Sequence, residues 1–268
     1  MIDANATIGT HDIVWVTLDT LRYDVAARCI ADGTTPFLAS VLPGGIWEKR
    51  HTPGSFTFAA HAAFFAGFLP TPASPGRHER LFALAFPGSE TTGPRTAVFD
   101  AATVVAGLAN RGYHTLCVGG VGFFNQRTPL GSVLPRLFVE SYWRPEMGVT
   151  HPRSTEFQVD QALSSAAALP PDRRLFLFLN VSAMHQPNYM YLDRAIEDSP
   201  ASQAAALSYV DRQLEFLFGG LRHRAPLLVV ICSDHGTAYG EDGYHGHRLA
   251  HPVVWEVPYA EFILERRG

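Results

Sequence analysis

One stretch near the C-terminus, Pro226 to His251, restricts the fold more than any other part of the chain. It opens with a short run of apolar and small residues, Leu227 to Ser233, which is typical of a buried strand in a parallel sheet. Asp234, His235 and a glycine follow directly. In open α/β sheets, catalytic and ligand-binding groups gather at the carboxyl ends of the strands. The stretch therefore predicts an α/β fold with a site at the end of this strand.

Strand and helix patterns alternate along the rest of the sequence. Short apolar runs predict central strands at Ile13 to Leu18, His114 to Val118, Leu175 to Val181 and Leu227 to Cys232. Helical patterns cover Pro36 to Val41, His61 to Phe68, Ala101 to Arg111, Glu156 to Leu169 and Ala201 to Leu221. This alternation predicts a three-layer α/β/α sandwich with a mostly parallel central sheet. No linker divides the sequence, so we expect a single domain over residues 1–268.

Composition restricts the classes of molecule that a protein with this fold is expected to bind. The net charge is −4 and no run of basic residues appears, which disfavours nucleic acid or an anionic membrane as the main partner. The three cysteines are unclustered and predict free thiols. The N-terminus does not resemble a signal peptide, and no stretch reaches the roughly 18 apolar residues that span a bilayer. We therefore expect a cytoplasmic protein whose partner is a small molecule, while the oligomeric state stays open.

A second acidic residue stands at the end of the first predicted strand. Asp19 follows Ile13 to Leu18 as Asp234 follows the late strand, so both carboxylates should face the same edge of the sheet. Together with His235 they offer the oxygen and nitrogen ligands that suit Zn²⁺, with Mn²⁺ or Mg²⁺ as alternatives. Solvated residues capping a strand are the other interpretation, and the two matching aspartates favour the metal.

Thr57 stands near the start of a helical stretch that follows a Pro-Gly-Ser loop. Backbone N–H groups at a helix N-terminus favour negative charge, and a nearby divalent cation would stabilise an alkoxide at neutral pH. A threonine in this place is more often a simple helix cap. The matching aspartates make a nucleophile the alternative that we carry forward.

Four segments occur in an order that resembles a known family. They are LDTLRYD around Asp19, TFAAHAAFFAG from Thr57, SAMHQP around His185, and SDHGTAYGEDGYHGH from Ser233. Each segment is weak by itself. Together, and spread from about Asp12 to Pro258, they resemble the alkaline phosphatase superfamily in its sulfatase-like and phosphoethanolamine-transferase-like branch. The resemblance implies an alkaline phosphatase-like fold and metal-dependent chemistry on ester bonds.

The resemblance also implies roles for individual residues. It gives the metal to Asp19, Thr57, Asp234 and His235, catalysis to Thr57, His185 and His247, and a second metal or the leaving group to His185, His245 and His247. The middle of the chain offers His185 without an evident acidic partner. We therefore favour one tightly held ion, with two ions as the alternative.

Further residues are candidates for binding the substrate. His61 lies on the same helix face as Thr57, Arg77 and His78 occupy a long loop rich in proline and glycine, and Asn125 follows the strand predicted at residues 114–118. Each has a plainer alternative, because loop arginines are commonly solvated and segments rich in Gly and Phe commonly serve packing.

Two departures from the family pattern restrict the function. Sulfatases that use formylglycine carry Cys or Ser in a C/S-x-P-x-R motif, whereas this chain has Thr57, Ala59 and His61 at the corresponding positions. A formylglycine sulfatase is therefore disfavoured. The membrane-anchored transferases carry transmembrane helices, for which this sequence shows no pattern, so a lipid or envelope substrate is disfavoured as well.

These observations favour metal-dependent hydrolysis of a phosphate mono- or diester of a small metabolite through a covalent threonine intermediate. A phosphoryl or sulfuryl transferase with an alcohol acceptor stays open, because the acceptor site would be formed by loops. A non-catalytic metal-binding protein is disfavoured by the intact nucleophile. An isomerase of the phosphosugar mutase kind is disfavoured because no large inserted domain is present in the sequence.

Overall fold

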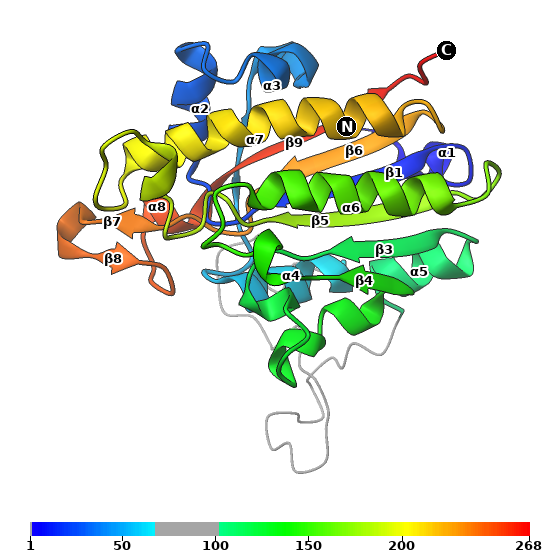
Figure 1. The fold of residues 1–268 in the computed structure, drawn as a ribbon, viewed down its shortest axis with the longest axis horizontal. Helices are drawn as coiled ribbons and strands as arrows, with labels where there is room; N and C mark the ends of the chain where they lie inside the picture. The colour runs from blue at the N-terminus through cyan, green and yellow to red at the C-terminus, as the bar shows by residue number, and fades with distance from the viewer. Residues whose placement is uncertain (1, 68–101) are drawn as a thin grey trace, which may run out of the picture.

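The central element is a seven-stranded sheet, shown in Figure 1, in the computed structural model that describes residues 2–67 and 102–268. Its strand order is β2-β9-β6-β1-β5-β3-β4. The bounds are β1 Asp12–Leu18, β2 Glu48–His51, β3 His114–Val118, β4 Glu140–Tyr142, β5 Leu175–Val181, β6 Leu227–Cys232 and β9 Glu256–Leu264. Strands β6, β1, β5, β3 and β4 run parallel, whereas β9 and β2 form an antiparallel edge. The parallel strands therefore bring their carboxyl ends to one edge of the sheet.

Helices cover both faces of this sheet. Their bounds are α1 Ala4–Thr7, α2 Tyr23–Ala31, α3 Pro36–Val41, α4 Thr57–Ala66, α5 Val104–Asn110, α6 Ser154–Ala168, α7 Pro200–Leu221 and α8 Pro252–Trp255. Helices α2, α3, α6 and α7 pack on one face and α4 and α5 on the other. The predicted three-layer arrangement around a mostly parallel sheet is confirmed.

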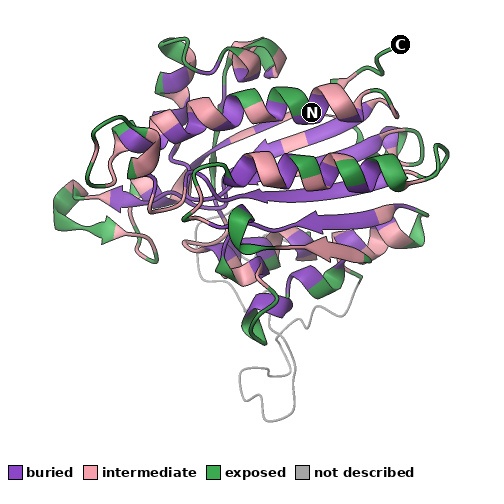
Figure 2. Cartoon of the chain, viewed as in Figure 1, coloured by how far each residue is buried: buried purple, intermediate pink, exposed green. Residues whose placement is uncertain are grey.

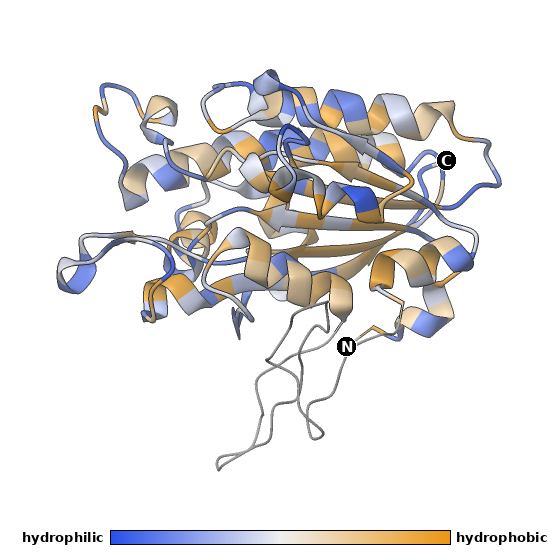
Figure 3. Ribbon diagram, turned by 90° about the horizontal axis from the view of Figure 1, so that it is seen from below, coloured by the Kyte–Doolittle hydropathy of each residue, from blue (hydrophilic) through white to orange (hydrophobic). Residues whose placement is uncertain are grey.

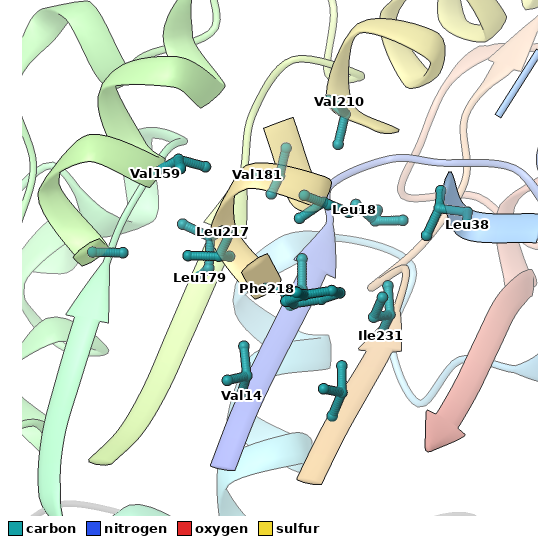
Figure 4. Packing of buried hydrophobic residues seen from close by; sticks show 14 of the residues in the cluster. Val14, Leu18, Leu38, Val159, Leu179, Val181, Val210, Leu217, Phe218 and Ile231 are labelled. Atoms are coloured by element: carbon teal, nitrogen blue, oxygen red, sulfur yellow. The ribbon is translucent and has the colours of Figure 1, made fainter. Parts of the chain in front are cut away.

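The larger core lies between the sheet and the face formed by α6 and α7. Because side chains alternate along a strand, Val14 and Leu18 of β1 point to this face, where they meet Leu179 of β5 and Phe218 of α7 (Figure 4). Ile13 and Trp15, which alternate with them along β1, point to the opposite face, which is rich in aromatic rings such as Phe178. Every residue of β5 is buried, as expected for a strand covered on both sides.

Figure 3 shows apolar strands in the interior and a mixture of polar and apolar residues on the helices that cover them. Cys29, Cys117 and Cys232 are buried free thiols, as predicted. Among helices of the described residues, none is both long and apolar enough to cross a membrane.

A small hairpin extends beyond the end of the sheet that carries the carboxyl ends of β1 and β6. It consists of β7 (Ala238–Tyr239) and β8 (His245–Gly246), and it follows β6 after a short loop. It lies at the left in Figure 1, and its tip is exposed in Figure 2. The hairpin returns the chain toward the residues that follow β1 and β6.

Some elements differ from the prediction for physical reasons. Strand β2 has the sequence EKRH and is exposed throughout, so no apolar pattern marks it. Helix α4 begins at Thr57 rather than at the predicted His61, and it ends at Ala66, after which the C-cap Gly67 has a left-handed φ of 66°. Helix α2, which begins directly after Arg22, and the antiparallel strand β9 were not predicted.

Candidate active site

Three buried side chains from neighbouring strand ends come together. Asp19 follows β1, Asp234 and His235 follow β6, and each is 0% exposed. One ligand atom from each of them lies within 4.8 Å of the others. Strands β1 and β6 are adjacent and parallel, which explains why residues far apart in the sequence meet here.

Each carboxylate in this cluster uses one oxygen and leaves the other without a partner. Asp19 Oδ2 accepts a hydrogen bond from Asn180 Nδ2 at 3.0 Å. Asp234 Oδ1 accepts from the backbone N–H groups of Thr20 at 3.2 Å and His235 at 3.0 Å. Asp19 Oδ1 and Asp234 Oδ2 are buried and find no partner among the described residues. Two unpaired carboxylate oxygens in the interior create a position that favours a cation.

The imidazole of His235 is oriented as a ligand. Its Nδ1–H donates to the carbonyl oxygen of Gly236 at 2.9 Å, which leaves the lone pair on Nε2. That Nε2 lies 3.4 Å from Asp234 Oδ2 and 3.3 Å from Thr57 Oγ1. Burial lowers the pKa of His235 and so favours the neutral imidazole that binds metals.

Electrostatics also support a cation at this position. Burial raises the pKa of the Asp19 carboxyl, and the neighbouring Asp234 raises it further. Burial likewise raises the pKa of the Asp234 carboxyl. Two buried carboxylates repel each other, and a divalent cation would relieve this repulsion. The donor set of two carboxylates, one imidazole and one hydroxyl fits Zn²⁺, and the oxygen donors also suit Mn²⁺ or Mg²⁺.

Thr57 is the first residue of α4 and is 2% exposed. The N-cap position belongs to Phe56, and no side chain makes a capping hydrogen bond at this helix end. The interpretation of Thr57 as a helix cap is therefore wrong, because its hydroxyl faces His235 Nε2 instead. The hydroxyl lies 3.3 Å from the His235 imidazole nitrogen at a helix N-terminus, where negative charge is favoured.

His61 takes a different position from the one predicted for a substrate contact. Its ring is 0% exposed, its Nδ1–H donates to the carbonyl oxygen of Thr57 at 2.7 Å, and its Nε2 lies 3.1 Å from Thr17 Oγ1. Burial lowers its pKa to about 3. Both ring nitrogens contact polar groups of the protein itself. His61 therefore stabilises the start of α4 and does not reach a substrate.

A cavity of about 450 Å³, which we call the Thr57 cavity, opens beside the nucleophile candidate. His185 and His247 line it together with Thr57, as the sequence suggested for groups acting on the substrate. The His247 ring lies 4.6 Å from the His235 ring and 6.0 Å from the His185 ring, measured between centroids. His245 does not join them: it is exposed on β8, where it pairs with Tyr239 of β7.

Other predicted substrate contacts are placed elsewhere. Asn125 does not line the Thr57 cavity, and its carboxamide oxygen accepts a hydrogen bond from the backbone N–H of Arg127 at 2.9 Å. That bond belongs to the local turn, in agreement with the plainer alternative. Arg77 and His78 lie outside the described residues.

The structure adds two residues that sequence reasoning missed. Asn180 is a polar residue inside the apolar strand LFLFLNV, and this break in the pattern was a readable signal. It orients Asp19 through the hydrogen bond described above. Arg248 lines the Thr57 cavity, but nothing in its sequence context distinguishes it from a surface arginine.

The hairpin that precedes His247 is anchored by a charge network. The buried guanidinium of Arg22 pairs with Asp24 at 2.6 Å and with Glu241. Glu241 also accepts a hydrogen bond from the backbone N–H of Tyr239 at 2.6 Å. The network fixes the loop between β7 and β8 to the start of α2.

Glu241→Ala is expected to loosen this hairpin without unfolding the protein. Amide hydrogens of residues 238–246 should exchange roughly 10-fold faster, because the opening free energy is local to the hairpin. Exchange in β5 should be unchanged. The surface substitution Glu197→Ala serves as the control, and equal exchange in both variants would show that Arg22 does not hold the hairpin.

Comparisons with known proteins agree with this geometry. Residues 11–260 match the family model described as Sulfatase, and no curated protein sequence matches the chain. The chain resembles the C-terminal periplasmic domain of phosphoethanolamine transferase EptC from Campylobacter jejuni with 14% identity, a TM-score of 0.61, and coverage of 95% of this chain and 80% of that one. The corresponding domain of EptC from Escherichia coli, in complex with Zn, has 11% identity, a TM-score of 0.61, and coverage of 96% of this chain and 74% of that one.

A protein of the alkaline phosphatase superfamily from Vibrio parahaemolyticus gives 15% identity, a TM-score of 0.57, and coverage of 94% of this chain and 60% of that one. These similarities show an alkaline phosphatase-like fold, which agrees with the order of the four sequence segments. The chain belongs to the sulfatase family, whose members are enzymes that transfer or hydrolyse phosphoryl or sulfuryl groups.

Proposed function

We propose that this protein is a metal-dependent hydrolase that cleaves phosphate mono- or diesters of small metabolites through a covalent Thr57 intermediate. The observation that carries the proposal is the position of Thr57 Oγ1, 3.3 Å from His235 Nε2 and at the N-terminus of α4. The proposed ligands of the metal are Asp19, Asp234, His235 and Thr57. The zinc complex of the E. coli relative supports Zn²⁺, with Mn²⁺ or Mg²⁺ as alternatives.

Bound metal would lower the pKa of the Thr57 hydroxyl and offset negative charge on the phosphoryl group. In the first step, Thr57 Oγ1 forms a bond to phosphorus while the bond from phosphorus to the ester oxygen breaks. His185 and His247 line the same cavity. Burial lowers the pKa of His247 to about 3, so His185 is the group that can supply a proton to that ester oxygen. In the second step, water attacks phosphorus and Thr57 leaves, with His185 accepting the proton of the water.

A panel of aryl esters tests this proposal. Zinc-loaded protein should release nitrophenol from para-nitrophenyl phosphate or from bis-para-nitrophenyl phosphate, and the preferred ester distinguishes monoesterase from diesterase activity. Protein treated with a chelator should lose the activity and recover it when zinc is added back. Release from para-nitrophenyl sulfate alone would instead indicate sulfuryl chemistry, and no release from any ester would contradict hydrolysis.

A transferase is the second candidate, because the C. jejuni relative is described as a phosphoethanolamine transferase. An alcohol would then take the place of water in the second step. The two functions are separated by measuring, in the presence of glycerol, nitrophenol together with the second hydrolysis product of the ester used. That product is inorganic phosphate for para-nitrophenyl phosphate and para-nitrophenyl phosphate for the diester. Equal amounts indicate hydrolysis, whereas nitrophenol in clear excess over the second product indicates transfer to the alcohol.

A further inference from the structure

The Thr57 cavity has a lining of two kinds. Its polar groups are Thr57, Thr128, His185, His247 and Arg248, and its apolar groups include Val121, Phe123, Leu130 and Val149. Among its described lining residues there is no Asp or Glu. A cavity of about 450 Å³ is large enough for a small organic group beside the phosphoryl group.

The apolar lining of the cavity packs against the residues on either side of Thr57. The Phe123 ring lies 5.7 Å from Phe58 in the first turn of α4 and 6.5 Å from Phe56, the residue before Thr57, measured between ring centroids. Leu130 is 51% exposed although it is a large apolar side chain. Apolar side chains that are exposed to solvent in a cavity beside a reactive group indicate a binding site, because a bound ligand would remove them from water.

Arg248 brings the permanent positive charge to the described lining of this cavity. Its backbone N–H donates to the carbonyl oxygen of Ser55 at 2.9 Å, which ties it to the loop before the nucleophile helix. Its guanidinium carbon lies 5.7 Å from the centre of the Phe56 ring. Its φ is 70°, a left-handed conformation that is uncommon for arginine and is typical of functional positions. A guanidinium in this position suits the oxygens of a phosphoryl group.

We propose that the Thr57 cavity binds an uncharged apolar ester group, so that the substrates are phosphate esters of aryl or alkyl alcohols, with Arg248 binding the phosphoryl oxygens. This inference rests on the proposed function for the position of the phosphoryl group. An aminoalkyl ester would bring an ammonium into a cavity whose described lining carries the positive charge of Arg248 and no Asp or Glu. Burying it without a carboxylate partner is unfavourable, whereas each buried methylene strengthens binding roughly four-fold.

Two non-hydrolysable ligands of nearly equal size test the inference by calorimetric titration of the zinc-loaded protein. Pentylphosphonate should bind roughly 10-fold more tightly than aminobutylphosphonate, in which an ammonium replaces the terminal methyl group. Leu130→Glu should cancel or invert this preference by providing a carboxylate. Val139→Glu is the matched control, since Val139 is 70% exposed and does not line the cavity. Arg248→Ala should weaken pentylphosphonate by roughly 10-fold, and aminobutylphosphonate by less, because the variant also removes the positive charge that repels the ammonium.

Equal affinities in the unaltered protein, no binding of either phosphonate, or an unchanged ratio in Leu130→Glu would overturn the inference. Phosphonates are not turned over, so this result is independent of catalysis. A protein that shows the preference but cleaves no phosphate ester would refute the proposed function and support the cavity assignment. An enzyme that cleaves phosphate esters but lacks the preference would support the proposed function and refute the cavity assignment.

Discussion

Thr57→Ala is expected to lower turnover of an aryl phosphate by about 10³-fold or more, because it removes the atom that would bond to phosphorus. The fold should be unaffected, since the Thr57 hydroxyl caps no helix and, among the described residues, its hydrogen-bonding neighbour is His235. The bound metal should remain, because the carboxylates and the imidazole are unchanged. Steady-state kinetics and metal analysis on the same preparation measure both effects.

Thr57→Ser provides the control for this substitution. It keeps a hydroxyl at the same position of α4 and should retain most of the turnover. If Thr57→Ala stayed within about ten-fold of the unaltered enzyme, the covalent mechanism would be wrong and direct attack by water would replace it.

Asp234→Asn should stabilise the metal-free protein at pH 8, although it removes a proposed ligand. The pKa of Asp234 is raised in the folded state by burial, so the folded chain binds a proton more tightly than the unfolded chain. The stabilisation that this group contributes is fully present below its pKa of about 4 in the unfolded chain. It is lost as the pH rises through its raised pKa in the folded chain. At pH 8 the aspartate is an unpaired buried charge, and asparagine is neutral.

The geometry supports this substitution. The carboxamide oxygen can keep the hydrogen bonds from the Thr20 and His235 backbones, and the amide can donate to His235 Nε2, which lies 3.4 Å from Asp234 Oδ2. In chelator at pH 8, thermal unfolding should shift upward by roughly 5 °C relative to the unaltered protein. The shift should shrink toward pH 5.

Added zinc should reverse the order of stability, because a ligand stabilises the state that binds it. The unaltered protein should gain stability with zinc, whereas Asp234→Asn should gain little. The surface change Asp160→Asn should alter neither result. A metal-free Asp234→Asn protein that is less stable at pH 8 would show that the carboxylate is satisfied in some other way.

The sequence predicted the sheet well because its central strands are continuous apolar runs. The predicted ranges at residues 114–118, 175–181 and 227–232 agree with β3, β5 and β6. The same logic placed Asp19 and Asp234 at one edge, since parallel strands end together. Strand β2 could not be predicted in this way because it is a charged edge strand without alternation.

Side-chain direction was the part that sequence could not provide. The helical spacing put His61 on the face of Thr57, but its burial among the rings of Phe124 and Phe178 depends on packing between distant segments. Arg248 reaches the cavity because its loop is tied to Ser55, a contact between residues almost two hundred positions apart. Such contacts leave no local pattern.

The most direct test of the account is to locate the metal. Crystals of the zinc-loaded protein, measured at the zinc absorption edge, should show anomalous density among Asp19 Oδ1, Asp234 Oδ2 and His235 Nε2, next to Thr57 Oγ1. These carboxylate oxygens have no partner among the described residues, and they gather beside the free imidazole nitrogen. Zinc located elsewhere, or a protein that binds none, would contradict both the metal site and the mechanism built on it.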